Sequence, residues 1–137
     1  MKKFLAASLA VFVWLMIFDH LLSSAVMGSA MASIPGVKAS YSAMWEAVGD
    51  LCSALVLCGF YGRVRTVYGA GLAGGAVFGV YAGTLMSFPT WLNMTNYFGW
   101  PYRTAWHLTI IVILIYVVAG AIAGMVYKAM GEPQPAA

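Results

Sequence analysis

Five ionisable side chains lie within or at the edges of strongly apolar stretches of this sequence. They are Asp19, His20, Glu46, Asp50 and His107. A charged group near the middle of a bilayer costs roughly 2.5 to 3.5 kcal/mol on insertion scales, so ionisable side chains inside membranes usually face a partner, a cavity or a ligand. Imidazoles and carboxylates together suit a borderline divalent ion such as zinc, iron or manganese. We therefore treat the five residues as a candidate metal site.

The same residues allow three other interpretations. His20 and His107 are two imidazoles on different helices, as in a bis-histidine haem b site. Glu46 and Asp50 have the chemistry of carriers in a proton relay or cation pathway. Alternatively, each acid is neutral or hydrogen-bonded near the membrane interface and only fixes the register of its helix. The sequence leaves these alternatives open.

The composition indicates an integral membrane protein. Of the 137 residues, 63% are hydrophobic and only 8% are charged, which is too apolar for a soluble domain. The net charge of +3 comes from basic residues scattered singly along the chain, which argues against nucleic-acid binding. The chain has no P-loop, Gly-x-Ser-x-Gly or dinucleotide motif, and no spacing pairs a nucleophile with a base. An enzyme is therefore the less favoured class, and the sequence leaves this point open.

Four apolar segments are each long enough to cross about 30 Å of hydrocarbon, which takes roughly 20 helical residues. We place these spans at about 4–24, 43–61, 67–88 and 104–127. A tight turn at 62–65 and an aromatic-rich loop at 89–103 are expected to join the last three spans. The predicted fold is all-α and polytopic, with residues 1–131 forming one four-helix transmembrane bundle and residues 132–137 a short tail.

The basic residues predict how these spans are oriented. One side of the membrane receives Lys2, Lys3, Arg63, Arg65 and Lys128, and the other side receives only Lys38 and Arg103. The positive-inside rule then places both termini in the cytoplasm. The first span also resembles a secretory signal, because two lysines precede an apolar run that ends in small residues. We expect it to stay in the protein as a membrane helix.

Small residues recur in the third and fourth spans at a spacing of four. The third span contains Gly71, Gly75, Gly79 and Gly83, and the fourth contains Gly120 and Gly124. Such ridges let membrane helices approach closely and gain van der Waals contact. We expect the ridge to be a packing interface, either within the chain or with a second copy or a partner subunit.

A short internal repeat suggests how the ionisable residues are brought together. A Tyr-x-x-x-Trp pattern followed by a polar residue occurs at Tyr41–Glu46 and again at Tyr102–His107. Two hairpins related by an axis along the membrane normal would place His107 at the position equivalent to Glu46. Asp19 and His20 end the first span at the same depth. We therefore expect up to five polar groups to converge at the external end of the bundle.

The second half of the chain resembles a group of small uncharacterised bacterial four-helix membrane proteins. The resemblance runs from Gly75–Gly79 through the Tyr-Phe-Gly-Trp-Pro stretch at 97–101 to Trp106 and the glycines of the fourth span. It implies a bundle in the bacterial inner membrane and no particular activity. Our functional expectation is a small membrane protein that binds or conducts a divalent metal ion or small solute. The alternatives are an accessory subunit of a larger membrane complex and a haem b subunit.

Overall fold

The computed structural model of the chain describes residues 1–22 and 42–131, and the regular structure of these residues is entirely α-helical. The helices are α1 (Lys2–Leu22), α3 (Ala43–Tyr68), α4 (Leu72–Phe98) and α5 (Tyr102–Ala129). All four are long and apolar enough to cross a membrane. The prediction of an all-α, multi-pass membrane protein is therefore confirmed. Lys38, Tyr41 and the expected tail at 132–137 lie outside the described residues.

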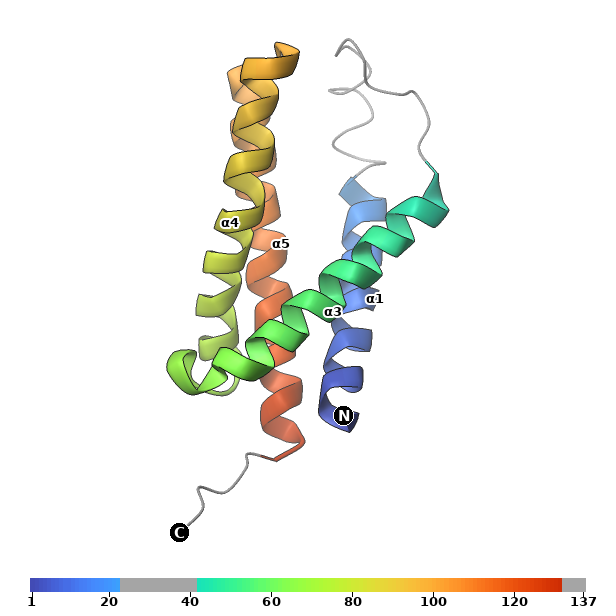
Figure 1. Cartoon of the computed structure of the whole chain (residues 1–137), viewed down its shortest axis with the longest axis vertical. Coiled ribbons are helices and arrows are strands. Elements are labelled where there is room, and N and C mark those ends of the chain that lie inside the picture. The colour runs from blue at the N-terminus through green and yellow to red at the C-terminus, as the bar shows by residue number, and fades with distance from the viewer. Residues whose placement is uncertain (23–41, 132–137) are drawn as a thin grey trace.

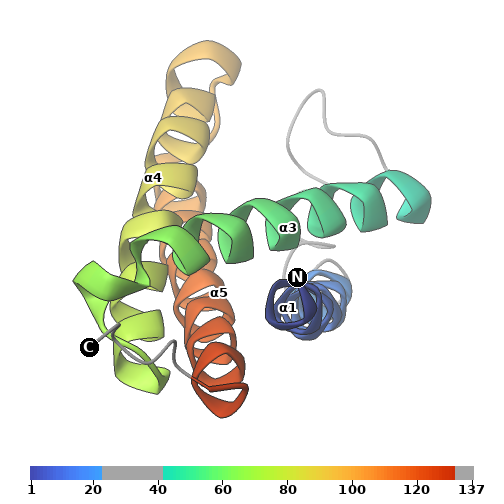
Figure 2. The same ribbon diagram turned by 60° about the horizontal axis from the view of Figure 1, so that its bottom comes forward.

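The helices α4 and α5 run antiparallel and side by side along their length, whereas α3 crosses the molecule obliquely (Figure 1). Seen from below, α3 extends from α1 to the α4–α5 pair (Figure 2). The start of α1 and the end of α5 lie together, since the Lys3 ammonium donates a hydrogen bond to the carbonyl oxygen of Gly131. The turn from α4 to α5 lies at the far end and reaches beyond the end of α1 (Figure 1).

The core forms where one face of each helix carries small or apolar residues four positions apart. In α1 this row is Ala7, Val11 and Leu15, and all three are buried. Residues four apart lie on the same helix face, so the row presents one continuous strip to its neighbours. The other members of the buried cluster are Ala54, Leu57, Cys58, Tyr61, Phe78, Ile115, Ala119, Ala123 and Tyr127. A hydrogen bond of 3.1 Å from the Trp14 indole Nε1 to the Ile115 carbonyl oxygen further ties α1 to α5.

The predicted glycine ridge lies between α4 and α5. A Cβ atom built on Gly75 would overlap the carbonyl oxygen of Gly120, and one built on Gly124 would overlap that of Gly71. A Cβ on Gly79 would overlap the Tyr116 carbonyl oxygen. All six glycines of the ridge are buried within this pair of helices. The close approach therefore joins two helices of the same chain.

The tight turn predicted at 62–65 is wrong, because α3 continues through both arginines to Tyr68. The chain turns instead at Gly69 and Gly71, whose φ angles of 84° and 89° are in the left-handed region that favours glycine. The Tyr61 hydroxyl donates a 3.0 Å hydrogen bond to the Gly69 carbonyl oxygen and holds the end of the helix. Arg63 and Arg65 favour a loop in the sequence. An arginine is nevertheless compatible with a helix at the membrane edge, because its aliphatic stem can lie in the apolar region while its guanidinium reaches water.

The loop predicted at 89–103 is also wrong for most of its length. Helix α4 runs through Pro89 to Phe98, and only residues 99–101 connect it to α5. Pro89 removes one backbone N–H, a loss that membrane helices tolerate when neighbouring groups compensate. The neighbouring hydroxyls of Ser87 and Thr90 donate to the carbonyl oxygens of Gly83 and Met86, at 2.6 and 2.7 Å, and not to the Leu85 carbonyl that would accept from residue 89. The helix ends at Gly99, which adopts a left-handed conformation with φ 67°.

Candidate functional site

Two aspartates lie in the helix rows that form the α1–α3 interface. Asp19 follows Leu15 by four residues and so continues the buried row of α1. Asp50 precedes the buried Ala54 by four residues in α3 and is itself only 6% exposed. The apolar spacing that packs the two helices therefore also brings two carboxyl groups together.

The carboxyl groups of Asp19 and Asp50 lie within hydrogen-bonding reach of each other. A hydrogen bond between two carboxyl groups needs a proton on one of them, because an ionised carboxylate only accepts. The Oδ2 atom of Asp50 is buried and has no hydrogen-bond partner among the described residues. A buried polar atom without a partner is costly, so it marks a place where a proton, a water molecule or an ion would be stabilised.

Glu46 and His20 extend this pair towards the α1 C-terminus and the α3 N-terminus. Glu46 lies one helical turn before Asp50 and interacts electrostatically with both Asp19 and His20. Its side chain is half-buried, whereas His20 is exposed. We refer to Asp19, His20, Glu46 and Asp50 as the acidic site.

Helix α5 contributes a tyrosine that sequence reasoning did not identify. The hydroxyl of the half-buried Tyr116 lies within hydrogen-bonding reach of Ser53 of α3 and interacts electrostatically with Asp19 and Asp50. Its only signal in the sequence is a single phenol in the middle of an otherwise aliphatic span. The hydroxyls of Tyr116 and Ser53 therefore make the α5 side of the site polar.

His107 does not take part in these interactions. It precedes Tyr116 by nine residues, which is about 13 Å along the helix and about half a turn around it. Its side chain is exposed on α5. The expected convergence of five groups assumed that the fourth span begins at about residue 104, directly at the membrane edge. Because α4 extends to Phe98, the start of α5 lies beyond the level of the acidic site.

The described residues contain no group of three or more His, Cys, Asp or Glu side chains arranged to hold a metal ion. The acidic site is a pair of neighbouring carboxyl groups, bordered by a third carboxyl and an imidazole. Such a group can take up and release a cation within the membrane, because each exchange changes the charge of a poorly hydrated pair.

The fold and the site together define a small multi-pass membrane protein with a pair of carboxyl groups, one buried and one half-buried, between α1 and α3. Comparisons of the chain with protein-family models, with curated proteins and with solved structures find no match. The functional argument therefore rests on the geometry of the site.

Proposed function

We propose that this protein binds and transfers a cation through the acidic site, and that the cation is a proton. The observation that carries the proposal is the close approach of the Asp19 and Asp50 carboxyl groups across the α1–α3 interface, with the Asp50 Oδ2 atom buried and without a partner among the described residues. Two carboxyl groups in contact hold one proton firmly, since ionising both would place two negative charges side by side in a medium of low dielectric constant. Intramembrane carboxyl groups are the usual carriers in proton relays.

The proposal includes a location and an orientation. The protein is a four-helix bundle of the bacterial inner membrane with both termini in the cytoplasm, as the positive-inside rule favours. The acidic site then lies towards the external face, where Glu46 and His20 connect the pair to solvent. In this arrangement Glu46 exchanges protons with the outside, and Asp19 and Asp50 hold the proton deeper in the membrane.

Proton movement by purified protein in sealed vesicles tests this function. Vesicles containing the protein and a pH-sensitive dye should acidify inside when an inside-negative potassium diffusion potential is imposed. Asp50→Asn should reduce the rate to that of protein-free vesicles, because an amide cannot release a proton at neutral pH. His107→Ala is the matched control and should transfer protons at the unchanged rate. Equal rates in protein-free, wild-type and Asp50→Asn vesicles would overturn the proposal.

A divalent metal ion is the second candidate occupant, favoured by Glu46 and His20 beside the carboxyl pair. Zinc, iron or manganese would have to displace the shared proton and draw in these two side chains, because metal ligands must be deprotonated. Elemental analysis of purified protein would then give a stoichiometric metal that Glu46→Ala and Asp50→Asn lose and His107→Ala keeps. A haem Soret absorption band lost in His107→Ala would instead favour the bis-histidine interpretation.

A further inference from the structure

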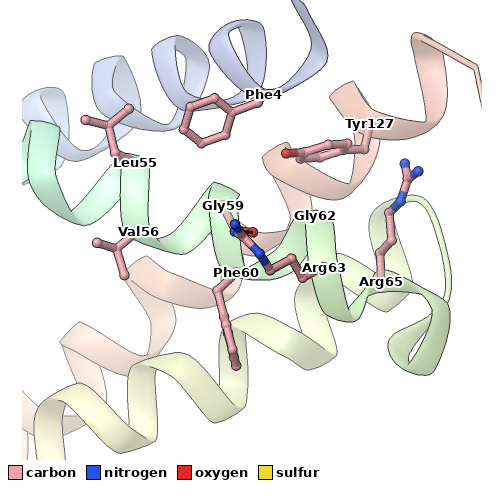
Figure 3. A pocket seen from close by; sticks show the side chains of 9 residues that line it. All are labelled: Phe4, Leu55, Val56, Gly59, Phe60, Gly62, Arg63, Arg65 and Tyr127. Atoms are coloured by element: carbon pink, nitrogen blue, oxygen red, sulfur yellow. Dashed lines mark hydrogen bonds between the residues drawn. The ribbon is translucent and has the colours of Figure 1, made fainter. Parts of the chain in front are cut away.

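A second polar feature lies at the opposite end of the molecule from the acidic site. There a pocket of about 600 Å³ opens between α1, α3 and α5. Its apolar wall is formed by Phe4 of α1 and by Leu55, Val56 and Phe60 of α3 (Figure 3). This end also carries Lys3, which bonds to Gly131, so it is the end where most of the basic residues gather.

Two arginines give the pocket a positive charge. Arg63 and Arg65 both line it, three and five residues after Phe60 of the apolar wall (Figure 3). Arg63 uses one guanidinium N–H to donate a 3.1 Å hydrogen bond to the Gly59 carbonyl oxygen. The Arg65 guanidinium lies 5.4 Å from the centre of the Tyr127 ring, in cation–π contact. A guanidinium has five N–H donors, so both arginines keep donors for a ligand.

The carboxylates of the described chain do not neutralise these arginines. Asp19, Glu46 and Asp50 are the acidic residues of the described ranges, and all three belong to the acidic site. Asp50 precedes Arg63 by thirteen residues, which is about 20 Å along α3. Two positive charges at the side of a membrane pocket therefore lack an anionic partner within the described part of the chain.

The shape of the pocket depends on two glycines that face it. A Cβ atom on Gly59 would meet only ordinary contacts, at 3.5 Å from the Phe4 ring and 3.7 Å from the Arg63 guanidinium. A Cβ on Gly62 would lie 2.7 Å from the Tyr127 hydroxyl, which is too close. That hydroxyl is fixed by donating a 3.0 Å hydrogen bond to the Cys58 carbonyl oxygen. The space beside Gly62 is therefore filled by Tyr127, whereas the absence of a side chain at Gly59 leaves room beside Arg63.

We propose that this pocket binds an anionic phospholipid of the surrounding bilayer. The phosphate of the headgroup would pair with Arg63 and Arg65, since guanidinium groups match phosphate geometry with two parallel hydrogen bonds. The acyl chain would lie against Phe4, Leu55 and Phe60, in the part of the pocket that is apolar. Basic pockets between membrane helices are a known recognition mode for anionic headgroups, and the combination of charge and apolar wall matches an amphiphile better than a free anion.

Native mass spectrometry and thermal unfolding of the full chain, reconstituted in bilayer discs, test the proposal. Wild-type protein should retain phosphatidylglycerol over phosphatidylcholine and should melt at a higher temperature in discs that contain phosphatidylglycerol. The double variant R63Q/R65Q should lose about thirtyfold in this preference, at about 1 kcal/mol for each basic residue that contacts an anionic headgroup. Gly59→Leu fills the pocket without changing its charge and should lower retention in the same way.

Two controls distinguish lipid binding in the pocket from general electrostatic attraction between basic residues and anionic lipid. The variant K2Q/K128Q removes two positive charges that do not line the pocket, and it should keep the wild-type preference. Adding inorganic phosphate at concentrations that do not screen charge should neither stabilise the protein nor release the lipid. The proposal is overturned if wild type shows no preference for phosphatidylglycerol, if K2Q/K128Q loses as much preference as R63Q/R65Q, or if inorganic phosphate reproduces the stabilisation. If R63Q/R65Q fails to fold, the preference of the wild type for phosphatidylglycerol still tests the proposal.

Discussion

At the scale of single residues, the Asp19–Asp50 contact links the charge of the acidic site to the packing of α1 on α3. Both side chains continue rows that are otherwise small or apolar, so the helices cannot separate their carboxyl groups without losing core contacts. The contact is stable only while a hydrogen remains between the two groups. A substitution that keeps a hydrogen-bond donor should therefore differ from one that removes the side chain.

We expect Asp50→Asn to fold with nearly the stability of the wild type, because the amide can donate to the Asp19 carboxylate. Asp50→Ala should cost about 1 to 3 kcal/mol, since it leaves a partly buried carboxyl without its partner. Denaturant unfolding in detergent, followed by circular dichroism, compares the two. Equal losses in both variants would mean that the hydrogen bond does not stabilise the α1–α3 interface.

Glycine substitutions give a second prediction at this scale. Gly75→Ala should destabilise the protein by about 1 to 3 kcal/mol, because the added methyl would overlap the backbone of α5 and force the two helices apart. Gly49→Ala is the matched control, as a Cβ there has nothing within 4 Å. It should be neutral or stabilising by about 0.5 to 1 kcal/mol, the usual gain from replacing a helical glycine. Melting temperatures that drop equally in both variants would contradict close α4–α5 packing.

At the scale of helices, the positions of the turns determine which side chains meet. The end of α3 depends on Gly69, which has φ 84° and open space around it. Gly69→Ala should therefore cost about 1 to 2 kcal/mol through backbone strain alone. Gly69→Asn should cost as much, because a ψ of 160° lies outside the left-handed helical region that asparagine tolerates. Thermal unfolding of the two variants measures both losses, and an alanine variant as stable as wild type would place the turn elsewhere.

The sequence was sufficient to predict the number and class of the helices, because four apolar segments of about 20 residues have few other solutions in a membrane. It was not sufficient to predict where they end. Arg63 and Pro89 lie in segments that the sequence predicts to be connections, yet both lie within helices. Positive φ angles at Gly69 and Gly99 set the real boundaries, and sequence alone does not distinguish those glycines from the ones inside the helices.

The sequence predicts only part of the acidic site. The four-residue spacing from Leu15 to Asp19 and from Asp50 to Ala54 places both aspartates on packed faces, and this can be read from local sequence. The position of His107 outside the acidic site depends on the length of α4. The contribution of Tyr116 depends on the axial position of α5 relative to α1 and α3. These are long-range consequences of packing that no local spacing reveals.

At the scale of the whole molecule, the two polar features lie at different depths. The acidic site joins the end of α1 to the start of α3, whereas the arginine pocket lies where α3 and α5 approach their ends. Because of this separation, the orientation of the protein in the membrane determines which leaflet each feature faces. If the basic end is cytoplasmic, the arginine pocket binds lipid of the cytoplasmic leaflet and the acidic site exchanges cations with the external side.

Cysteine labelling in intact cells tests this orientation. In a Cys52→Ser, Cys58→Ala background, we would place single reporters at Asn93 and Asn96 near the end of α4, and at Thr66 and Ala129 near the basic end. All four positions are exposed and uncharged, so the reporters leave the distribution of basic residues unchanged. A membrane-impermeant maleimide should label the two asparagine positions from outside and should reach the other two only after the cells are opened. Labelling of Thr66 and Ala129 in intact cells would place the arginine pocket in the outer leaflet and the acidic site towards the cytoplasm, which would reverse the proposed direction of proton entry.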